Sequence, residues 1–161
     1  MENRKLYIIA HNIRSAHNVG AIFRSCDGAG VQKIFLTGYS QRPAEEDKEI
    51  KSKPEKMLEK TALGAQLSVE WEGADDLAAL IVRLKKAGVQ IVALEKTDSS
   101  LNIKKFKPAF PMALILGHEV DGVKDEILRM CDAVIDIPMR GKKESLNVSV
   151  ATGIAIYEIL G

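Results

Sequence analysis

An asparagine and an arginine six residues apart, Asn18 and Arg24, give the segment 11–24 the means to bind an anion. A guanidinium group can bind a phosphate through two parallel hydrogen bonds, so a phosphate is a natural ligand for Arg24. On the predicted helix 17–29, Arg24 projects nearly opposite the apolar stripe and Asn18 lies at the edge of that stripe. A helix cap at Asn18 and a solvated side chain at Arg24 explain the same pattern. These two residues alone therefore leave a structural and a functional interpretation open.

Two glycines enclose a glutamate in the segment Gly117-His-Glu119-Val-Asp-Gly122. Gly117 directly follows a buried apolar run, and its lack of a side chain allows a ligand to approach the backbone closely. Glu119 lies in the turn that follows. We expect His118 to be a surface histidine. An ordinary strand-to-helix turn with an exposed acid is the alternative interpretation.

A strand and a helix enclose a polar loop in the segment 135–149. The strand runs into Pro138, and Ser145 is predicted to cap the last helix, roughly 147–160. This helix is apolar in almost every direction, so we expect the body of the protein to cover one side and a second subunit to cover the other. A solvated basic loop is the alternative, but a polar loop in this place suits ligand binding better than space filling.

Predicted strands and helices alternate along the chain. We expect strands at 6–10, 33–37, 67–71, 89–94, 113–116 and 133–137, and helices at 17–29, 55–60, 75–87, 125–131 and 147–160. This alternation predicts an α/β fold, a mostly parallel sheet with helices on both faces. Ligands of such sheets bind outside the carboxyl ends of the strands. Those ends include 11–12, 95–97, 117–119 and 138–140, which is where we expect the site.

The composition is that of an ordinary soluble protein, with 46% hydrophobic and 28% charged residues among 161. This length suits one domain, 1–161, whose core needs neither disulfide nor metal. The apolar runs are too short to span a bilayer, and the first residues lack the apolar centre of a signal peptide. We therefore expect a cytoplasmic protein. Cys26 and Cys131 are expected to be reduced, although the sequence does not exclude a disulfide between them.

The net charge of +1 argues neither for nor against nucleic-acid binding, but the basic residues are unevenly placed. Those beside the three segments are Arg14, Arg24, Arg140, Lys142 and Lys143. A second basic group at 104–107 is expected to be solvated surface. The three histidines lie on separate segments, so we expect no metal site. The glycine-rich motifs of dinucleotide and nucleoside-triphosphate binding are missing, as is the serine-hydrolase motif.

Together, the three segments resemble the motifs of the SpoU (TrmH-like) family of RNA ribose 2′-O-methyltransferases, within the SPOUT superfamily. The first resembles Asn-x-Gly-x-x-x-Arg, present as Asn18-Val-Gly20-Ala-Ile-Phe-Arg24. The second resembles Gly-x-Glu-x-x-Gly, present at 117–122. The third resembles Ile-Pro-Met followed by Ser-Leu-Asn-Val-Ser, present at 137–139 and 145–149. Lys60-Thr-Ala-Leu-Gly-Ala65 is also typical of the family, so the resemblance covers nearly the whole chain.

The resemblance implies a Rossmann-like fold with a C-terminal trefoil knot, a topology that general folding rules alone would exclude. It implies S-adenosyl-L-methionine as the cofactor, held by backbone groups of three loops at Leu94, Gly117, Ile137, Met139 and Leu146. The catalytic residue implied is Arg24, supported by Asn18, Glu119, Ser145 and Asn147.

The resemblance also implies an RNA substrate, tRNA or rRNA. The apolar character of 148–160 on both sides predicts a homodimer formed through this C-terminal helix. The candidate RNA ligands are Arg14, Arg24, Arg140 and Lys142. No metal is expected, because the methyl donor carries its own leaving group. No membrane is expected, because the apolar runs are too short to span one. Since Leu6 already begins the catalytic fold, we expect no appended RNA-binding domain.

A guanidinium is too strongly protonated to act as a base, so we expect Arg24 to bind the RNA phosphate beside the target hydroxyl and position it. Glu119 is expected to orient Asn18 or Arg24. Two alternatives remain. One is a SPOUT-fold enzyme that methylates an RNA base, with Glu119 or Asp121 as general base. The other is a catalytically silent, knotted RNA-binding protein.

Overall fold

A sheet of seven strands forms the centre of the computed structural model, which describes residues 3–161. In chain order the strands are β1 (Leu6–His11), β2 (Lys33–Thr37), β3 (Trp71–Ala74), β4 (Gln90–Leu94), β5 (Leu101–Asn102), β6 (Met112–Leu116) and β7 (Ala133–Asp136). Their order across the sheet is β3-β2-β1-β6-β4-β7-β5, and neighbouring strands run parallel. The predicted parallel α/β fold is confirmed.

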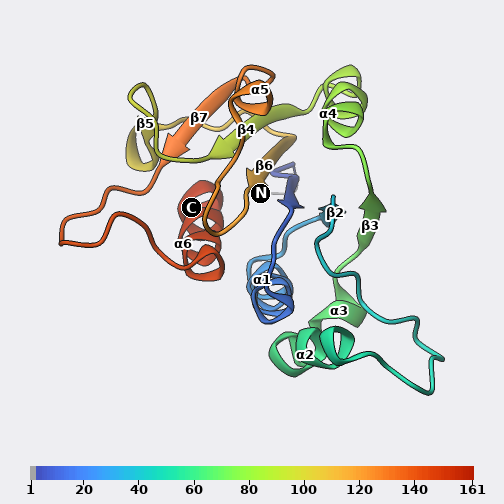
Figure 1. Cartoon of the computed structure of the whole chain (residues 1–161). Coiled ribbons are helices and arrows are strands. Elements are labelled where there is room, and N and C mark those ends of the chain that lie inside the picture. Colours follow the sequence, from blue (N-terminus) through green and yellow to red (C-terminus); the bar gives the residue numbers. More distant parts are fainter. Residues whose placement is uncertain (1–2) are drawn as a thin grey trace.

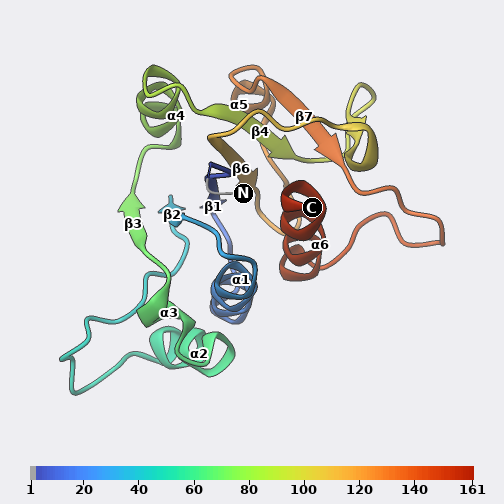
Figure 2. The ribbon, with the colours of Figure 1, turned by 180° about the vertical axis from the view of Figure 1, so that it is seen from behind.

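Helices cover both faces of this sheet (Figures 1 and 2). They are α1 (Ala16–Ala29), α2 (Lys53–Ala62), α3 (Ala65–Ser68), α4 (Leu77–Lys86), α5 (Asp125–Leu128) and α6 (Val148–Leu160). On one face α1 packs against α6 and α2, and on the other lie α4 and α5. Each layer has its own apolar core, with Phe23 and Ile156 in one and Ile81 and Ile127 in the other. The five residues of β6 are all buried because both faces of this central strand are covered.

The strand order brings together segments that are distant in sequence. β6 lies between β1 and β4, and β7 pairs with the other side of β4. Because these strands are parallel, their carboxyl ends meet at one edge of the sheet. The predicted ligand-binding segments 11–12, 95–97, 117–119 and 138–140 lie at or just after these ends.

A glycine sets the close approach of α1 to α2. An ideal Cβ on Gly20 would collide with Thr61 Oγ1 and with the carbonyl oxygen of Leu58. The Thr61 hydroxyl donates a hydrogen bond to the carbonyl oxygen of His17 at 2.8 Å. Gly20 therefore fixes the position of α1, the helix that carries Asn18 and Arg24.

Several predicted elements were wrong or too long. Residues 65–68 form α3, so the predicted strand at 67–71 is wrong. The prediction failed because the apolar alternation continues from the end of this helix into β3. The predicted helix at 125–131 stops after Leu128, and the chain then turns so that the Asp132 carboxylate accepts a hydrogen bond from the N–H of Ile91 at 2.8 Å. The two-residue β5 and the 3₁₀ turn that follows it were missed, since such short elements give no periodicity.

The predicted cap of the last helix was also wrong. α6 begins at Val148, and its cap is Asn147 rather than Ser145. The Asn147 side-chain oxygen accepts hydrogen bonds from the N–H groups of Ser149 at 2.9 Å and Val150 at 3.4 Å. Asparagine and serine cap helices about equally well, so the sequence did not discriminate between them.

Two faces of α6 have different surroundings. Thr152, Ala155 and Ile156 are buried, which confirms that the body covers one side of this helix. Ile154 and Tyr157 are 43% and 58% exposed on another side. Within residues 3–161, no helix combines the length and the apolar character needed to cross a membrane.

Both cysteines are free thiols. Burial raises the pKa of Cys26 far above its ordinary value. Burial also raises the pKa of Cys131 to about 11, an effect that Lys85 opposes and Asp132 reinforces. Because the thiolate is the reactive form, the raised pKa values lower the reactivity of both thiols near neutral pH.

Candidate active site

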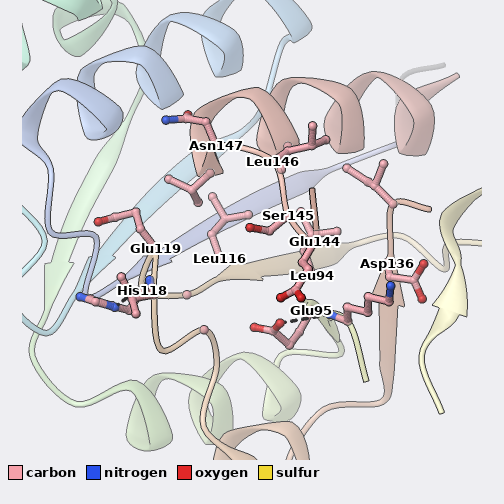
Figure 3. A pocket seen from close by; sticks show the side chains of 17 residues that line it. Leu94, Glu95, Leu116, His118, Glu119, Asp136, Glu144, Ser145, Leu146 and Asn147 are labelled. Atoms are coloured by element: carbon pink, nitrogen blue, oxygen red, sulfur yellow. Dashed lines mark hydrogen bonds between the residues drawn. The ribbon is translucent and has the colours of Figure 1, made fainter. Parts of the chain in front are cut away.

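A cavity of about 620 Å³ opens where β4, β6 and β7 end (Figure 3). Its walls are the residues that follow these three strands and the segment that leads into α6. Ser145, Leu146 and Asn147 come from that segment, and Glu119 comes from the loop after β6. The cavity therefore lies at the edge of the sheet where the sequence predicted a site.

The structure brings most of the predicted cofactor residues together. Leu94, Gly117, Ile137 and Leu146 line the cavity although they come from four different segments. Met139 is not among the lining residues. It lies in the segment between β7 and α6, which projects away from the body of the protein (Figure 1).

Asn147 joins the last helix to the first. Besides capping α6, its side-chain amide donates a hydrogen bond to Asn18 Oδ1 at 3.3 Å. The pair connects the cavity wall to α1, whose first turn Ser15 caps by accepting a hydrogen bond from the N–H of Asn18 at 3.2 Å. Two predicted catalytic residues from opposite ends of the chain are therefore in contact.

Glu119 has a different partner from the one predicted. Its Oε1 accepts a hydrogen bond from the backbone N–H of Arg14 at 3.0 Å, rather than contacting the side chain of Asn18 or Arg24. A carboxylate that accepts from a backbone N–H forms a charge-assisted bond. Glu119 therefore ties the loop after β6 to the loop before α1.

Arg24 lies outside this cavity. It is exposed on α1 and lines a separate open depression of about 550 Å³, together with Lys60 of α2 and Tyr157 of α6. Arg14, Arg140 and Lys142 are exposed, the last two on the segment between β7 and α6. The structure thus leaves the predicted RNA ligands accessible but does not place them around the cofactor cavity of the same chain.

Three acidic residues in the cavity wall lie in the predicted segments 95–97 and 135–149 but were not named as site residues: Glu95, Asp136 and Glu144. The Asp136 carboxylate accepts a hydrogen bond from the Ser100 hydroxyl at 2.6 Å, which fixes its position. The one signal in the sequence was position, since Glu95 follows β4 directly. Together with Glu119, these residues give the cavity lining four carboxylates, against one lysine, Lys96. Negative charge is therefore in excess, and the lining favours a ligand that carries positive charge.

His118 is more enclosed than the predicted surface histidine, with a side chain only 15% exposed. Its Nδ1 accepts hydrogen bonds from the N–H groups of Val120 at 3.1 Å and Asp121 at 3.0 Å. His118 also lines the cavity. Its ring therefore shapes the turn that carries Glu119.

His11, at the end of β1, lies with its Nδ1 2.8 Å from Thr37 Oγ1. Burial, and secondarily the positive charge of Lys124, lower the pKa of His11 below its ordinary value of 6.5. The ring is therefore neutral at pH 7.

The lining suits a small ligand with both an apolar and a cationic part. The cavity volume lies within the range of about 300–1,000 Å³ that is typical of small-molecule sites. Leu94, Leu116 and Leu146 provide apolar surface, and the four carboxylates provide negative charge. Among residues 3–161, no group of three or more His, Cys, Asp or Glu side chains is arranged to hold a metal ion.

Comparisons with known proteins point to one family. The model of the SpoU rRNA Methylase family matches residues 5–157. The tRNA (guanosine(18)-2′-O)-methyltransferase of Aquifex aeolicus is 36% identical over 96% of this chain and 68% of its own length. The 23S rRNA (guanosine-2′-O-)-methyltransferase RlmB of Yersinia pestis is 31% identical over 95% of this chain, which spans only 58% of that relative.

Solved structures give the same result. The A. aeolicus TrmH/SpoU tRNA modifying enzyme has a TM-score of 0.80 at 34% identity, covering 98% of this chain and 76% of that one. An AdoMet-bound rRNA methyltransferase from Sinorhizobium meliloti has a TM-score of 0.83 at 25% identity, covering 98% of this chain and 56% of that one. With its sheet, its cavity and these similarities, the chain belongs to the SpoU rRNA methylase family.

Proposed function

We propose that this protein is a methyltransferase that uses S-adenosyl-L-methionine to methylate a ribose 2′-hydroxyl of tRNA or rRNA. The observation that carries the proposal is that Leu94, Gly117, Ile137 and Leu146 line one shared cavity in a chain of the SpoU family. The two relatives described above are named as guanosine 2′-O-methyltransferases, of tRNA and of 23S rRNA, which supports both the reaction and the substrate class.

S-adenosyl-L-methionine would supply an activated methyl group on a sulfonium, with a neutral thioether as leaving group. Backbone groups at the four lining positions would hold it, and Met139 of the segment before α6 would add a fifth contact. The carboxylates of Glu95, Asp136 and Glu144 support this assignment because they complement a cationic ligand.

The reaction requires that the ribose hydroxyl lose its proton as its oxygen bonds to the methyl carbon and the carbon–sulfur bond breaks. Arg24 would bind the neighbouring RNA phosphate, which holds the hydroxyl in line and offers an oxygen to accept the proton. Asn18, Ser145 and Asn147 would orient the ribose, and Glu119 would hold the loop beside it through Arg14.

A homodimer would bring these groups together. Exposed apolar surface on monomers is usually limited, and the exposed face of α6 includes Val150, Ile154 and Tyr157. Two copies of this face can cover each other in an isologous contact. Tyr157 also borders the depression that contains Arg24, so the same contact would carry Arg24 toward the cavity of the partner subunit. Arg14, Arg140 and Lys142 would then guide the RNA backbone.

We further propose that residues 1–161 act as a single methyltransferase domain with the C-terminal trefoil knot of the superfamily. The segment between β7 and α6, which contains Met139, would form part of that knot. The proposed setting is the cytoplasm, where tRNA and rRNA are available.

Calorimetric titration with S-adenosyl-L-methionine tests the cofactor, and we expect saturable binding by the folded chain. Methylated RNA is then digested to nucleosides, which mass spectrometry separates into ribose-methylated and base-methylated products. A base-methylated product would replace the proposed reaction by the base-methyltransferase alternative. Binding without any transfer to tRNA or rRNA would favour the silent RNA-binding alternative, and no binding at millimolar concentration would reject the proposal.

Light scattering tests the dimer. We expect about twice the chain mass of 17.7 kDa at micromolar concentration. A single species at the mass of one chain would contradict the dimer, and Tyr157→Glu is expected to shift the population toward that mass.

A further inference from the structure

The loop between β6 and α5 is wound tightly on itself. The N–H of Gly122 donates a hydrogen bond to the carbonyl oxygen of His118 at 2.9 Å. An ideal Cβ on Gly117 would lie 2.5 Å from the carbonyl carbon of Gly122 and 2.7 Å from Val123 Cγ2. The two ends of the loop therefore touch, and the backbone of Gly117 can stay in the cavity wall only while Gly122 and Val123 keep their places.

One side chain from outside the loop holds this end in place. Glu95, the residue after β4, accepts a hydrogen bond from the N–H of Val123 through Oε2 at 2.9 Å. Its other oxygen accepts from the N–H of Lys96 at 3.1 Å, which fixes the orientation of the carboxylate. Hydrogen bonds to an ionised acceptor are roughly twice as strong as neutral ones.

The fit between Glu95 and the loop leaves no free space. Gly122 has a φ of +65°, and an ideal Cβ there would collide with Glu95 Oε2 and lie 2.9 Å from its Cδ. The carboxylate thus occupies the space that a side chain at 122 would need. Glu95 lies beside Leu94 in the same cavity (Figure 3).

The same loop carries Glu119, whose carboxylate reaches Arg14. Displacement of Val123 would therefore move Gly117 in the cavity wall and would also strain the contact between Glu119 and the loop before α1. One carboxylate at the end of β4 governs two parts of the site.

We propose that Glu95 is a positioning residue for the methyl-donor site, and that its carboxylate holds the loop 117–123 in the shape that binds the donor. The inference rests on the proposed function. Glu95 acts through the backbone N–H of Val123, so its contribution depends on its acceptor oxygens and on Gly122.

Matched variants test this role through two measurements, the Kd for S-adenosyl-L-methionine and the amide hydrogen exchange rate of Val123. Loss of a hydrogen bond to a charged group should raise the Kd of Glu95→Ala about tenfold or more, with faster exchange at Val123. Glu95→Gln keeps one carbonyl oxygen as an acceptor, so it should recover much of the affinity. Asp98→Ala, an exposed acid on the β4–β5 connection, should change neither quantity.

A second control separates positioning from general stability. Asp76→Ala removes the cap of α4, on the other face from α1 and α6, and should lower the unfolding temperature without changing the Kd. Unmutated affinity in Glu95→Ala would overturn the inference, as would unchanged exchange at Val123. If Glu95→Ala does not fold, Gly122→Ala decides, because its Cβ would displace the Glu95 carboxylate from Val123. It should raise both the Kd and the exchange rate of Val123, and unchanged values of both in a folded sample would overturn the inference.

The two proposals can fail separately. If the unmutated chain does not bind S-adenosyl-L-methionine, the proposed function fails. The exchange rate of Val123 would still show whether Glu95 holds the loop. If the unmutated chain binds and Glu95→Ala binds equally well, the inference fails and the proposed function stands.

Discussion

Asn147 performs two tasks that a pair of substitutions can separate. Its side-chain oxygen caps α6, and its side-chain amide donates to Asn18. Asn147→Ala removes both, and loss of a cap costs about 1 kcal/mol. For a chain of this length that corresponds to a decrease of about 2–4 °C in the unfolding temperature. Asn147→Asp keeps an oxygen for Ser149 and Val150, and its charge interacts favourably with the start of a helix, so its stability should stay near that of the unmutated protein.

Turnover should not follow stability in these two variants. Aspartate cannot donate to Asn18 Oδ1, so Asn147→Asp should lose turnover despite its stability, and Asn147→Ala should lose both. Thermal unfolding without ligand and methyl transfer at saturating donor measure the two quantities. Asp76→Ala, with a comparable cap loss on α4, should match the stability of Asn147→Ala but retain turnover. Full turnover in Asn147→Asp would refute the role of the Asn18 contact, and a stability loss equal to that of Asn147→Ala would refute the cap assignment.

Three further predictions concern Gly20, Arg24 and His11. Gly20→Ala should destabilise the fold by about 1–3 kcal/mol in urea unfolding, because its Cβ would collide with Thr61 and Leu58. Gly153→Ala is the control: the nearest atom to its Cβ would be Ser25 Oγ at 3.5 Å, so stability should stay unchanged or rise. Arg24→Ala should abolish turnover, change the Kd for the methyl donor little, and change the free energy of unfolding by less than about 0.5 kcal/mol. Retained turnover would show that Arg24 is merely solvated. His11 has a lowered pKa in the folded protein, so the unfolded chain binds its proton first as the pH falls, and stability should decrease below about pH 6.5. His11→Gln should flatten that decrease in thermal unfolding measured from pH 7 to pH 5, and an identical slope in both proteins would contradict the assignment.

The sequence located the site because parallel strands end at a common edge. Leu94 ends β4, and Gly117 and Ile137 directly follow β6 and β7. Parallel strands were enough to expect the segments 95–97 and 117–119 at one edge, whereas Leu94 and Ile137 themselves were implied by the resemblance to the SpoU family. The exposure of Arg24 also followed from its angle on the helix. That angle contains no information about neighbouring elements, so the separate depression beside Lys60 could not be predicted.

The missed features depend on contacts across the fold rather than on local pattern. Glu95 resembles any acid at a strand end until Val123 is seen to donate to it. Ser145 and Asn147 are both good helix caps, and which one serves depends on where the chain leaves the cavity wall. The helix at 65–68 was missed because apolar alternation continues through it, and only the pairing of Trp71 with Ile34 shows where the strand begins.

The position of β6 between β1 and β4 has a consequence for the order in which the protein can fold. Leu6 pairs with Met112, so the centre of the sheet closes a loop that contains most of the chain. Closing so long a loop is entropically costly, and topologies with such distant pairs fold slowly. During synthesis, β1 can pair with β6 only after β6 has left the ribosome. The cavity wall is complete only after Asn147 has been added to the chain. The ability to bind a ligand therefore cannot precede the synthesis of the segment that leads into α6, because Ser145, Leu146 and Asn147 complete the cavity wall.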